Sequence, residues 1–298
     1  MEDSIQSKSP AGGLLSHGYT SCAGCGASLA MRYTLEVLGR ETIVVIAAGC
    51  WSVIAGSFPY SALNVPVFHT AFETAASVAA GVKAGLMMQG DTDTNVLAWA
   101  GDGGTFDIGM QALSGVVERN EDMIYVCYDN EAYMNTGIQR SSSTPWGAWT
   151  TTTPGDCTKS RPKKNMVEIL AAHRIPYAAT ASIAYPHDLM EKVRKAKEKS
   201  GTRFIHIFTP CPAGWKSNPE HTIRLARLGV ETKIFPLYEV EGGLIYRINR
   251  IPKGIPVTEY LKLQGRFRHL LERDVEYIQR NVDIEWERLQ EKVRHDKL

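Results

Sequence analysis

The most constraining feature of this sequence is an apolar run that leads directly into a glycine-rich turn. Residues 95–100, NVLAWA, are predicted to form a buried strand. The turn follows at once as Gly101-Asp102-Gly103-Gly104. Beyond it, apolar side chains recur at helical spacing, at Phe106, Met110, Leu113 and Val117. A strand, a tight turn and a helix in this order are typical of an α/β protein with a mostly parallel sheet.

The turn also has the chemistry of an ion site. Glycine lets the backbone approach a ligand closely, and N–H groups at a strand-to-helix turn attract phosphate. A second apolar run, residues 123–128, delivers Asn130 to the same edge, 28 residues after Asp102. The carboxylate of Asp102, an Asn130 oxygen and a nearby carbonyl, such as that of Ala132, would suit Mg²⁺ bound to a diphosphate.

Bulk composition narrows the class of protein. The chain has 298 residues, 44% of them hydrophobic, which is enough for one large α/β domain. A net charge of +1 gives no basic surplus for nucleic acid. No apolar run approaches a membrane span, and residues 1–10 lack a signal-peptide core, so we expect a cytoplasmic protein with no membrane partner. Six cysteines then favour metal or redox chemistry over disulfides.

Asp102 and Asn130 resemble the thiamine-diphosphate motif, in which GDG is followed by an asparagine. The stretch 128–137, YDNEAYMNTG, is similar to the β subunits of pyruvate:ferredoxin oxidoreductase and its sister 2-oxoacid:ferredoxin oxidoreductases. The resemblance extends from His17 to about residues 260–270 and covers most of the chain. It implies the thiamine-diphosphate-binding fold, a mostly parallel sheet with helices on both faces, and it implies thiamine diphosphate and Mg²⁺ as cofactors. The residues expected at this cofactor are Gly49, Cys50, Gly101, Asp102, Gly103, Gly104, Asn130 and Ala132, with Asp102, Asn130 and Ala132 as the Mg²⁺ ligands.

Four cysteines are placed where they could share one site. Cys22 and Cys25 form a C-x2-C loop before a helix, and Cys50 and Cys211 each follow a predicted strand, at residues 43–48 and 203–208. The carboxyl ends of parallel strands meet at one edge of a sheet, where ligands bind. Four thiolates there would fit either zinc or an iron–sulfur cluster, and spacing alone does not decide between them.

The neighbouring cofactor favours the cluster, because electrons from a thiamine-dependent oxidation cannot be accepted by redox-inert zinc. The C-x2-C pair, the third cysteine 25 residues later and the Pro-Cys-Pro around Cys211 are similar to the family pattern. The resemblance thus implies that Cys22, Cys25, Cys50 and Cys211 bind one [4Fe-4S] cluster. Cys127 is expected to be a small core residue. Cys157 lies in a polar loop; a spare thiol is expected, but its role stays open.

Three further residues are candidates for the site. Asn135 could simply bond its own loop, but the resemblance places it near the substrate and the reactive carbon, as a candidate catalytic residue. Glu73 could be the carboxylate that activates the aminopyrimidine. The family takes that glutamate from the partner α subunit, so Glu73 is expected to be structural. His69 is a weaker candidate for lining the cofactor pocket.

The pattern along the chain predicts three parts. Residues 1–16 are expected to be an N-terminal arm, and residues 17–240 the domain that binds thiamine diphosphate and the cluster. Strand patterns at 43–48, 95–100, 123–128, 177–180 and 203–208 alternate there with helical ones. Residues 241–298, highly charged and helical from about residue 260, are expected to be a C-terminal extension that contacts partner subunits.

The resemblance implies oxidative decarboxylation of a 2-oxo acid to an acyl-coenzyme A, or the reverse reaction. It also implies an α subunit, further γ and ferredoxin-like δ subunits, and ferredoxin as electron acceptor. Pyruvate is the leading substrate; 2-oxoisovalerate, 2-oxoglutarate, oxalate and aryl glyoxylates stay open, because partner subunits also line the pocket. Two rival interpretations are a non-redox thiamine enzyme with structural zinc and a non-catalytic cluster carrier. The GDG motif and Asn130 count against the second.

Overall fold

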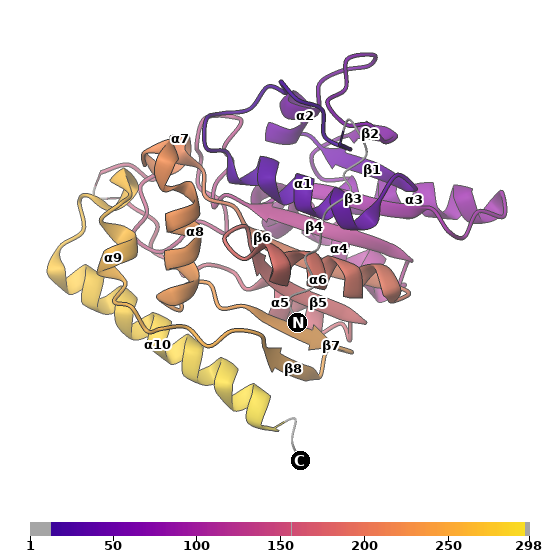
Figure 1. Ribbon diagram of the computed structural model, residues 1–298. Helices are drawn as coiled ribbons and strands as arrows, with labels where there is room; N and C mark the ends of the chain where they lie inside the picture. The colour runs from indigo at the N-terminus through magenta and orange to yellow at the C-terminus, as the bar shows by residue number, and fades with distance from the viewer. Residues whose placement is uncertain (1–12, 156, 296–298) are drawn as a thin grey trace, which may run out of the picture.

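A twisted sheet runs through the middle of the molecule (Figure 1). The computed structural model describes residues 13–155 and 157–295. Within these ranges the sheet has eight strands in the order β2-β1-β3-β4-β6-β5-β7-β8. Their bounds are β1 Thr42–Ala47, β2 Val67–Thr70, β3 Asn95–Gly101, β4 Met123–Asp129, β5 Tyr177–Ser182, β6 Thr202–Phe208, β7 Tyr238–Glu241 and β8 Ile245–Ile248. The first six in this order are parallel, and β7 and β8 add an antiparallel hairpin.

Helices cover both faces of the sheet. They are α1 Gly26–Leu38, α2 Cys50–Ala55, α3 Ala75–Met88, α4 Met110–Glu118, α5 Met166–Ala171, α6 Pro186–Glu198, α7 Pro212–Trp215, α8 Thr222–Glu231, α9 Thr258–Leu261 and α10 Glu272–His295. Helices α1 and α6 share one apolar core with the sheet, and they cross in front of it in Figure 1. Helices α3, α4, α5 and α10 contribute to a second core. The expected α/β fold with a mostly parallel, doubly covered sheet is confirmed.

The five strands expected from apolar runs are present as β1, β3, β4, β5 and β6. The sequence did not indicate β2, β7 or β8. Each of these has only four residues, and β2 and β8 lie at the two edges of the sheet with partly exposed side chains. A short edge strand contains no continuous apolar run, so its sequence pattern is weak.

The helix expected directly after the glycine turn is interrupted. Gly103–Asp107 forms a π-helical turn, and α4 begins only at Met110. At Gly109 a Cβ atom would lie 2.0 Å from the carbonyl oxygen of Gly104, so only glycine fits between the two segments. Phe106 and Leu113 are nevertheless buried, as their spacing predicted. The apolar pattern was therefore right about the buried face and wrong about a continuous α-helix; π-turns of this kind are frequent at functional sites.

The main sheet continues past residue 240, where the sequence suggested the start of an extension. The hairpin of β7 and β8 spans that position, and β7 pairs with β5. Beyond it, α10 (yellow in Figure 1) packs against its own chain next to β8 and buries Trp286 and Leu289. At the other end, residues 1–12 of the expected arm lie outside the described residues, and Leu15 is buried and bridges to Leu63. In the described ranges, no helix combines the length and the apolarity needed to cross a membrane.

Candidate functional site

Four neighbouring parallel strands carry the predicted site residues. Strands β1, β3, β4 and β6 are adjacent in the sheet and point the same way. Just beyond their carboxyl ends lie Cys50, Asp102, Asn130 and Cys211, one after each strand. These residues are up to 161 positions apart in the sequence (211 − 50), and the topology places them in a row along one edge. This is the edge at which open parallel sheets bind ligands.

The three oxygen groups predicted to bind Mg²⁺ lie together. The inward atom of the Asn130 side-chain amide is 2.9 Å from Asp102 Oδ1 and 3.0 Å from the carbonyl oxygen of Ala132. With the nitrogen inward, the amide donates hydrogen bonds to both oxygens; with the oxygen inward, three oxygens face one another. Mg²⁺ binds its ligands octahedrally at about 2.0–2.1 Å, so adjacent ligand oxygens are about 2.9 Å apart. The donor set and its spacing therefore fit Mg²⁺.

Asp102 is held in a setting that favours a cation. Its carboxylate is fully buried and accepts a 2.5 Å hydrogen bond from Ser141 Oγ. Burial and the nearby Asp129 carboxylate raise the pKa of Asp102 well above its usual range. A divalent cation bound by the three oxygens would offset both the burial and the repulsion by Asp129, because its positive charge stabilises the ionised Asp102 carboxylate in place of water.

Two glycines at this edge are required by close contacts. A Cβ at Gly103 would lie 2.4 Å from the ring of Tyr133, which covers the turn. Gly49 has φ +155°, and a Cβ added at this position would lie 3.2 Å from the hydroxyl oxygen of Tyr128. Side chains at these positions would push away the rings that shape the edge.

The four cysteines of the proposed cluster are mutual neighbours. The N–H of Cys25 donates to the carbonyl of Cys22 at 3.1 Å, which closes the C-x2-C turn. The N–H of Gly26 then donates to Pro210 at 3.3 Å and ties this turn to the segment before Cys211. Burial raises the pKa of Cys50 to about 12, and the thiols of Cys211, Cys25 and Cys22 add to the shift. The structure thus brings together the four cysteines selected from the sequence.

The comparisons with known proteins bear on this edge of the sheet. Residues 47–207 match the family described as thiamine pyrophosphate enzyme, C-terminal TPP binding domain. The chain is 54% identical over 285 residues to the ketoisovalerate oxidoreductase subunit VorB of Pyrococcus horikoshii, with 91% of each protein covered. It is 52% identical over 279 residues to the pyruvate synthase subunit PorB of Methanothermobacter thermautotrophicus, covering 93% of this chain and 97% of that protein.

The chain belongs to the β subunits of the 2-oxoacid:ferredoxin oxidoreductases. The family resemblance seen in the sequence is confirmed, and membership in an oxidoreductase family counts against both rival interpretations. A solved structure with a similar fold is the 2-oxoglutarate:ferredoxin oxidoreductase from Magnetococcus marinus. The match has a TM-score of 0.58 and 24% identity, and it covers 72% of this chain and 79% of the other.

The remaining candidates in this β subunit lie apart from the oxygen set. Asn135 and Glu73 are exposed, and within the described residues neither side chain has a hydrogen bond or ion pair. His69 is also exposed, and its Nε2 lies 3.0 Å from the Gly56 carbonyl oxygen. Cys127 is buried in mid-strand, as expected for a core residue, and Cys157 is exposed. The catalytic role of Asn135 therefore stays a prediction.

The structure adds polar residues that the sequence did not single out. Asp129 precedes the ligand Asn130 and is fully buried. It accepts hydrogen bonds from Ser143 Oγ at 2.7 Å, from Lys163 Nζ at 2.5 Å and, depending on the tautomer, from His206 Nε2 at 2.7 Å. Burial opposes ionisation, but Lys163 and His206 outweigh it and hold the pKa of Asp129 below its usual range. No local pattern marked these residues, because their partner is far away in sequence.

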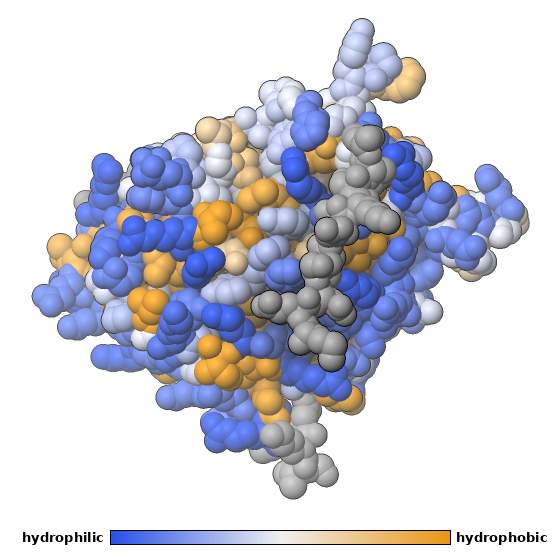
Figure 2. Space-filling view, viewed as in Figure 1, coloured by the Kyte–Doolittle hydropathy of each residue, from blue (hydrophilic) through white to orange (hydrophobic). Residues whose placement is uncertain are grey.

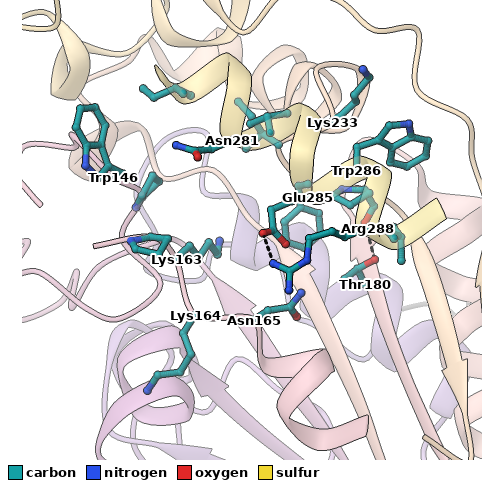
Figure 3. A pocket seen from close by; sticks show the side chains of 18 of the residues that line it. Trp146, Lys163, Lys164, Asn165, Thr180, Lys233, Asn281, Glu285, Trp286 and Arg288 are labelled. Carbon is teal, nitrogen blue, oxygen red and sulfur yellow. Dashed lines mark hydrogen bonds and ion pairs between the residues drawn. The ribbon is translucent and has the colours of Figure 1, made fainter. Parts of the chain in front are cut away.

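A cavity of about 600 Å³ is lined in part by Lys163 and His206 of this buried cluster (Figure 3). Residues of α10, including Trp286 and Arg288, form one wall. The opposite wall includes Lys163, Lys164 and Glu131. Glu131 directly follows Asn130, but Asp102, Asn130 and Ala132 are not among the lining residues, so the cavity is separate from the three oxygens.

Proposed function

We propose that this β subunit binds thiamine diphosphate through Mg²⁺ and holds one [4Fe-4S] cluster in a pyruvate:ferredoxin oxidoreductase complex. The reaction is coenzyme A-dependent oxidative decarboxylation of the 2-oxo acid, or its reverse. The observation that carries the proposal is the side-by-side placement of the Asp102–Asn130–Ala132 oxygen set and four cysteines on one sheet edge. When bound, thiamine diphosphate supplies the electron sink that decarboxylation needs.

The protein's part at the diphosphate is to hold and to shield. Asp102, Asn130 and the Ala132 carbonyl would hold the Mg²⁺ that accompanies the diphosphate. The glycines of the turn let backbone N–H groups approach the phosphates. Because Asp102 is buried and Ser141 is bonded to it, the inner side of the metal site is closed to water.

The chemistry of the reaction supports a cluster over zinc. Among the residues that the structure describes, no three His, Cys, Asp or Glu side chains converge on a single ion. Electrons that leave a thiamine-bound intermediate need an acceptor, and zinc is redox-inert. The ligands of a [4Fe-4S] cluster are cysteine thiolates, and such a cluster can accept these electrons. Cys22, Cys25, Cys50 and Cys211 would be these ligands.

Two features of the thiols suit electron transfer. Burial raises the pKa of Cys211 to about 11, and the backbone N–H groups of Gly214 and Ala213 beside the thiol counteract part of that rise. Hydrogen bonds to cluster sulfurs are one of the factors that set a reduction potential. Cys50 is close enough to Asp102 for that carboxylate to contribute to its raised pKa, although burial and the other thiols dominate. A cluster here would be next to the thiamine site.

Substrate choice rests on the intact complex. Pyruvate is the proposed substrate, and 2-oxoisovalerate is the second candidate, because the ketoisovalerate relative is 54% identical and the pyruvate relative 52%. We expect pyruvate to give the highest kcat/KM in a panel of 2-oxo acids with coenzyme A and a ferredoxin or viologen acceptor. Preference for 2-oxoisovalerate would move the protein to the second function, and no acceptor reduction with any 2-oxo acid would contradict the proposal.

Exposed apolar residues support assembly with other subunits. Between α2 and β2 a loop projects from the molecule, and it carries Phe58 and Tyr60, which are 95% and 87% exposed (Figure 1). On the face shown in Figure 2, apolar residues form several separate groups among hydrophilic ones. We propose that α, γ and ferredoxin-like δ subunits cover such groups, that the outer side of α10 contributes to these contacts, and that the complex delivers electrons to ferredoxin.

The isolated chain is expected to show no 2-oxo acid oxidation, even with cofactor and cluster bound. The reason is that the pyrimidine-activating glutamate is expected from the α subunit, since Glu73 is exposed and unbonded. The measurement is acceptor reduction by the purified single subunit, compared with the same subunit after the α subunit is added. Turnover by the single subunit would contradict the expectation and make Glu73 a catalytic candidate.

A further inference from the structure

The turn that carries two of the three proposed Mg²⁺ ligands has an unusual centre. Between Asn130 and Ala132 lies Glu131, whose φ is +66°. This left-handed conformation is disfavoured for a residue with a side chain. Asp129 Oδ1 accepts the N–H of Glu131 at 2.9 Å and so holds the bend from one side. A strained residue between two metal ligands needs further support to persist.

The backbone carbonyls of this turn are individually fixed. Trp215 Nε1 donates to the carbonyl of Asn130 at 2.8 Å, and Thr144 Oγ1 donates to that of Glu131 at 2.8 Å. These bonds engage the carbonyls of two successive residues and fix the path of the turn. The carbonyl of Ala132 then faces the Asn130 amide at 3.0 Å.

The carboxylate of Glu131 is clamped between two cations. It is 1% exposed, with Oε1 2.9 Å from Lys163 Nζ and Oε2 2.5 Å from Arg266 Nη2. Arg266 is itself 2% exposed and comes from the C-terminal segment, 135 residues further along the chain. Its guanidinium lies over the ring of Trp215, 4.0 Å from the centroid, and its Nε donates to Gln264. The residue that fixes the Asn130 carbonyl is thus braced by the residue that binds Glu131.

We propose that Glu131 is a positioning residue, which acts with Arg266 and Trp215 to aim Asn130 and the Ala132 carbonyl at the metal. This inference rests on the proposed Mg²⁺ site. A buried ion pair is weak evidence for stability, because apolar side chains of similar volume often stabilise a core as well. The geometry of the turn gives this pair a different role. Glu131 is part of the turn that carries the ligands, Trp215 donates to the Asn130 carbonyl, and Arg266 contacts both Glu131 and Trp215.

The test measures Mg²⁺ dependence in the intact complex with thiamine diphosphate present. In Glu131→Gln we expect the Mg²⁺ concentration for half-maximal cofactor binding to rise about tenfold, the loss typical of groups that orient metal ligands. The amount of cofactor bound at saturating Mg²⁺ should equal that of the wild type. Calorimetry of cofactor binding at a series of Mg²⁺ concentrations gives both quantities. A role in stability alone would lower the melting temperature and leave the midpoint unchanged.

Glu239→Gln is the matched control. Glu239 is also 1% exposed and held by a lysine, with Lys195 Nζ at 3.0 Å and Tyr177 Oη at 2.7 Å, but it lies on β7, away from the site edge. We expect its Mg²⁺ midpoint to match the wild type. An unshifted midpoint in assembled Glu131→Gln, or an equal shift in Glu239→Gln, would overturn the proposal. If wild-type complex binds the cofactor without Mg²⁺ dependence, the proposed function fails instead.

Two substitutions at Arg266 keep the test decisive if Glu131→Gln does not assemble. Arg266→Lys keeps a cation for Glu131 but loses the planar group that lies on Trp215. Arg266→Met loses both the charge and the hydrogen bonds. We expect the Mg²⁺ midpoint to rise in the order wild type, Arg266→Lys, Arg266→Met. Equal Mg²⁺ midpoints in all three proteins would overturn the proposal that Arg266 helps to position the metal ligands.

Discussion

Asp102→Ala is expected to abolish Mg²⁺-dependent binding of thiamine diphosphate and to leave the fold and the iron content of the complex unchanged. The substitution removes the charged member of the oxygen set, and Asn130 and the Ala132 carbonyl remain as neutral ligands. Groups that merely orient metal ligands are worth about 10–100-fold in affinity, so loss of a ligand should exceed about 100-fold. Isothermal titration of the cofactor into the variant complex measures this loss.

The fold should tolerate Asp102→Ala because the ionised Asp102 carboxylate destabilises the folded chain. Burial and Asp129 raise its pKa, which means that its charged form is disfavoured there. Removing the carboxylate relieves that cost, although it leaves the Ser141 hydroxyl without its acceptor. Asp102→Asn serves as control: its one oxygen can take the Oδ1 position that faces the metal site, and its NH2 group can then donate to Ser141 Oγ, so it should retain part of the affinity. Unchanged affinity in Asp102→Ala would show that the metal is bound elsewhere.

The sequence was enough to locate the edge of the sheet that carries the site, because the strands that end there are long, buried and apolar. Strands β3 and β4 appear in the sequence as apolar runs, so the positions just after them could be assigned to one edge of the sheet. The rule that ligands bind at the carboxyl ends of parallel strands also indicated Cys50 and Cys211, although no local sequence motif connects these two cysteines. This rule requires only that the strands run parallel, and the alternation of strands with helices already indicated that direction.

The supporting residues could not be found in this way. Arg266 lies in a highly charged stretch where an arginine usually indicates a solvated surface, yet it is buried against Glu131. Ser141 lies in a polar loop of serines and threonines, and only the folded chain shows that it reaches Asp102. Such contacts depend on tertiary packing of distant segments. Residue type and spacing carry no signal for them.

The C-terminal segment illustrates the same limit. Its charge and helical pattern predicted an extension that wraps a partner, whereas in the structure α10 buries Trp286 and Leu289 against its own domain. The pattern predicted a helix there correctly, but a charged helical pattern does not say which surface the apolar side of the helix will meet. Contacts of the outer side of α10 with other subunits stay a proposal.

Cys211→Ala is expected to stop electron export while the complex still binds thiamine diphosphate and releases carbon dioxide from the substrate once per site. Cys211 lies between β6 and α7, directly before the first residue of α7, and its thiol lies near those of Cys25 and Cys22. Removal of one of four thiolates should damage or lose the cluster, since retention and potential depend on the ligands. Asp102 and Asn130 follow other strands, so the cofactor site should persist.

The decisive measurements are made together on the intact complex: iron content, the electron paramagnetic resonance signal of the reduced protein, carbon dioxide release and acceptor reduction. We expect one cluster's worth of iron to be lost and acceptor reduction to fall below detection, because the first acceptor beside the thiamine is gone. Cys157→Ala is the control, since this exposed thiol is not among the neighbours of Cys50 and should change neither quantity. Full iron content with normal electron transfer in Cys211→Ala would show that Cys211 is not a ligand. Cys157 would then be the next ligand to test, and a cluster carried wholly by other subunits would follow if its loss also had no effect.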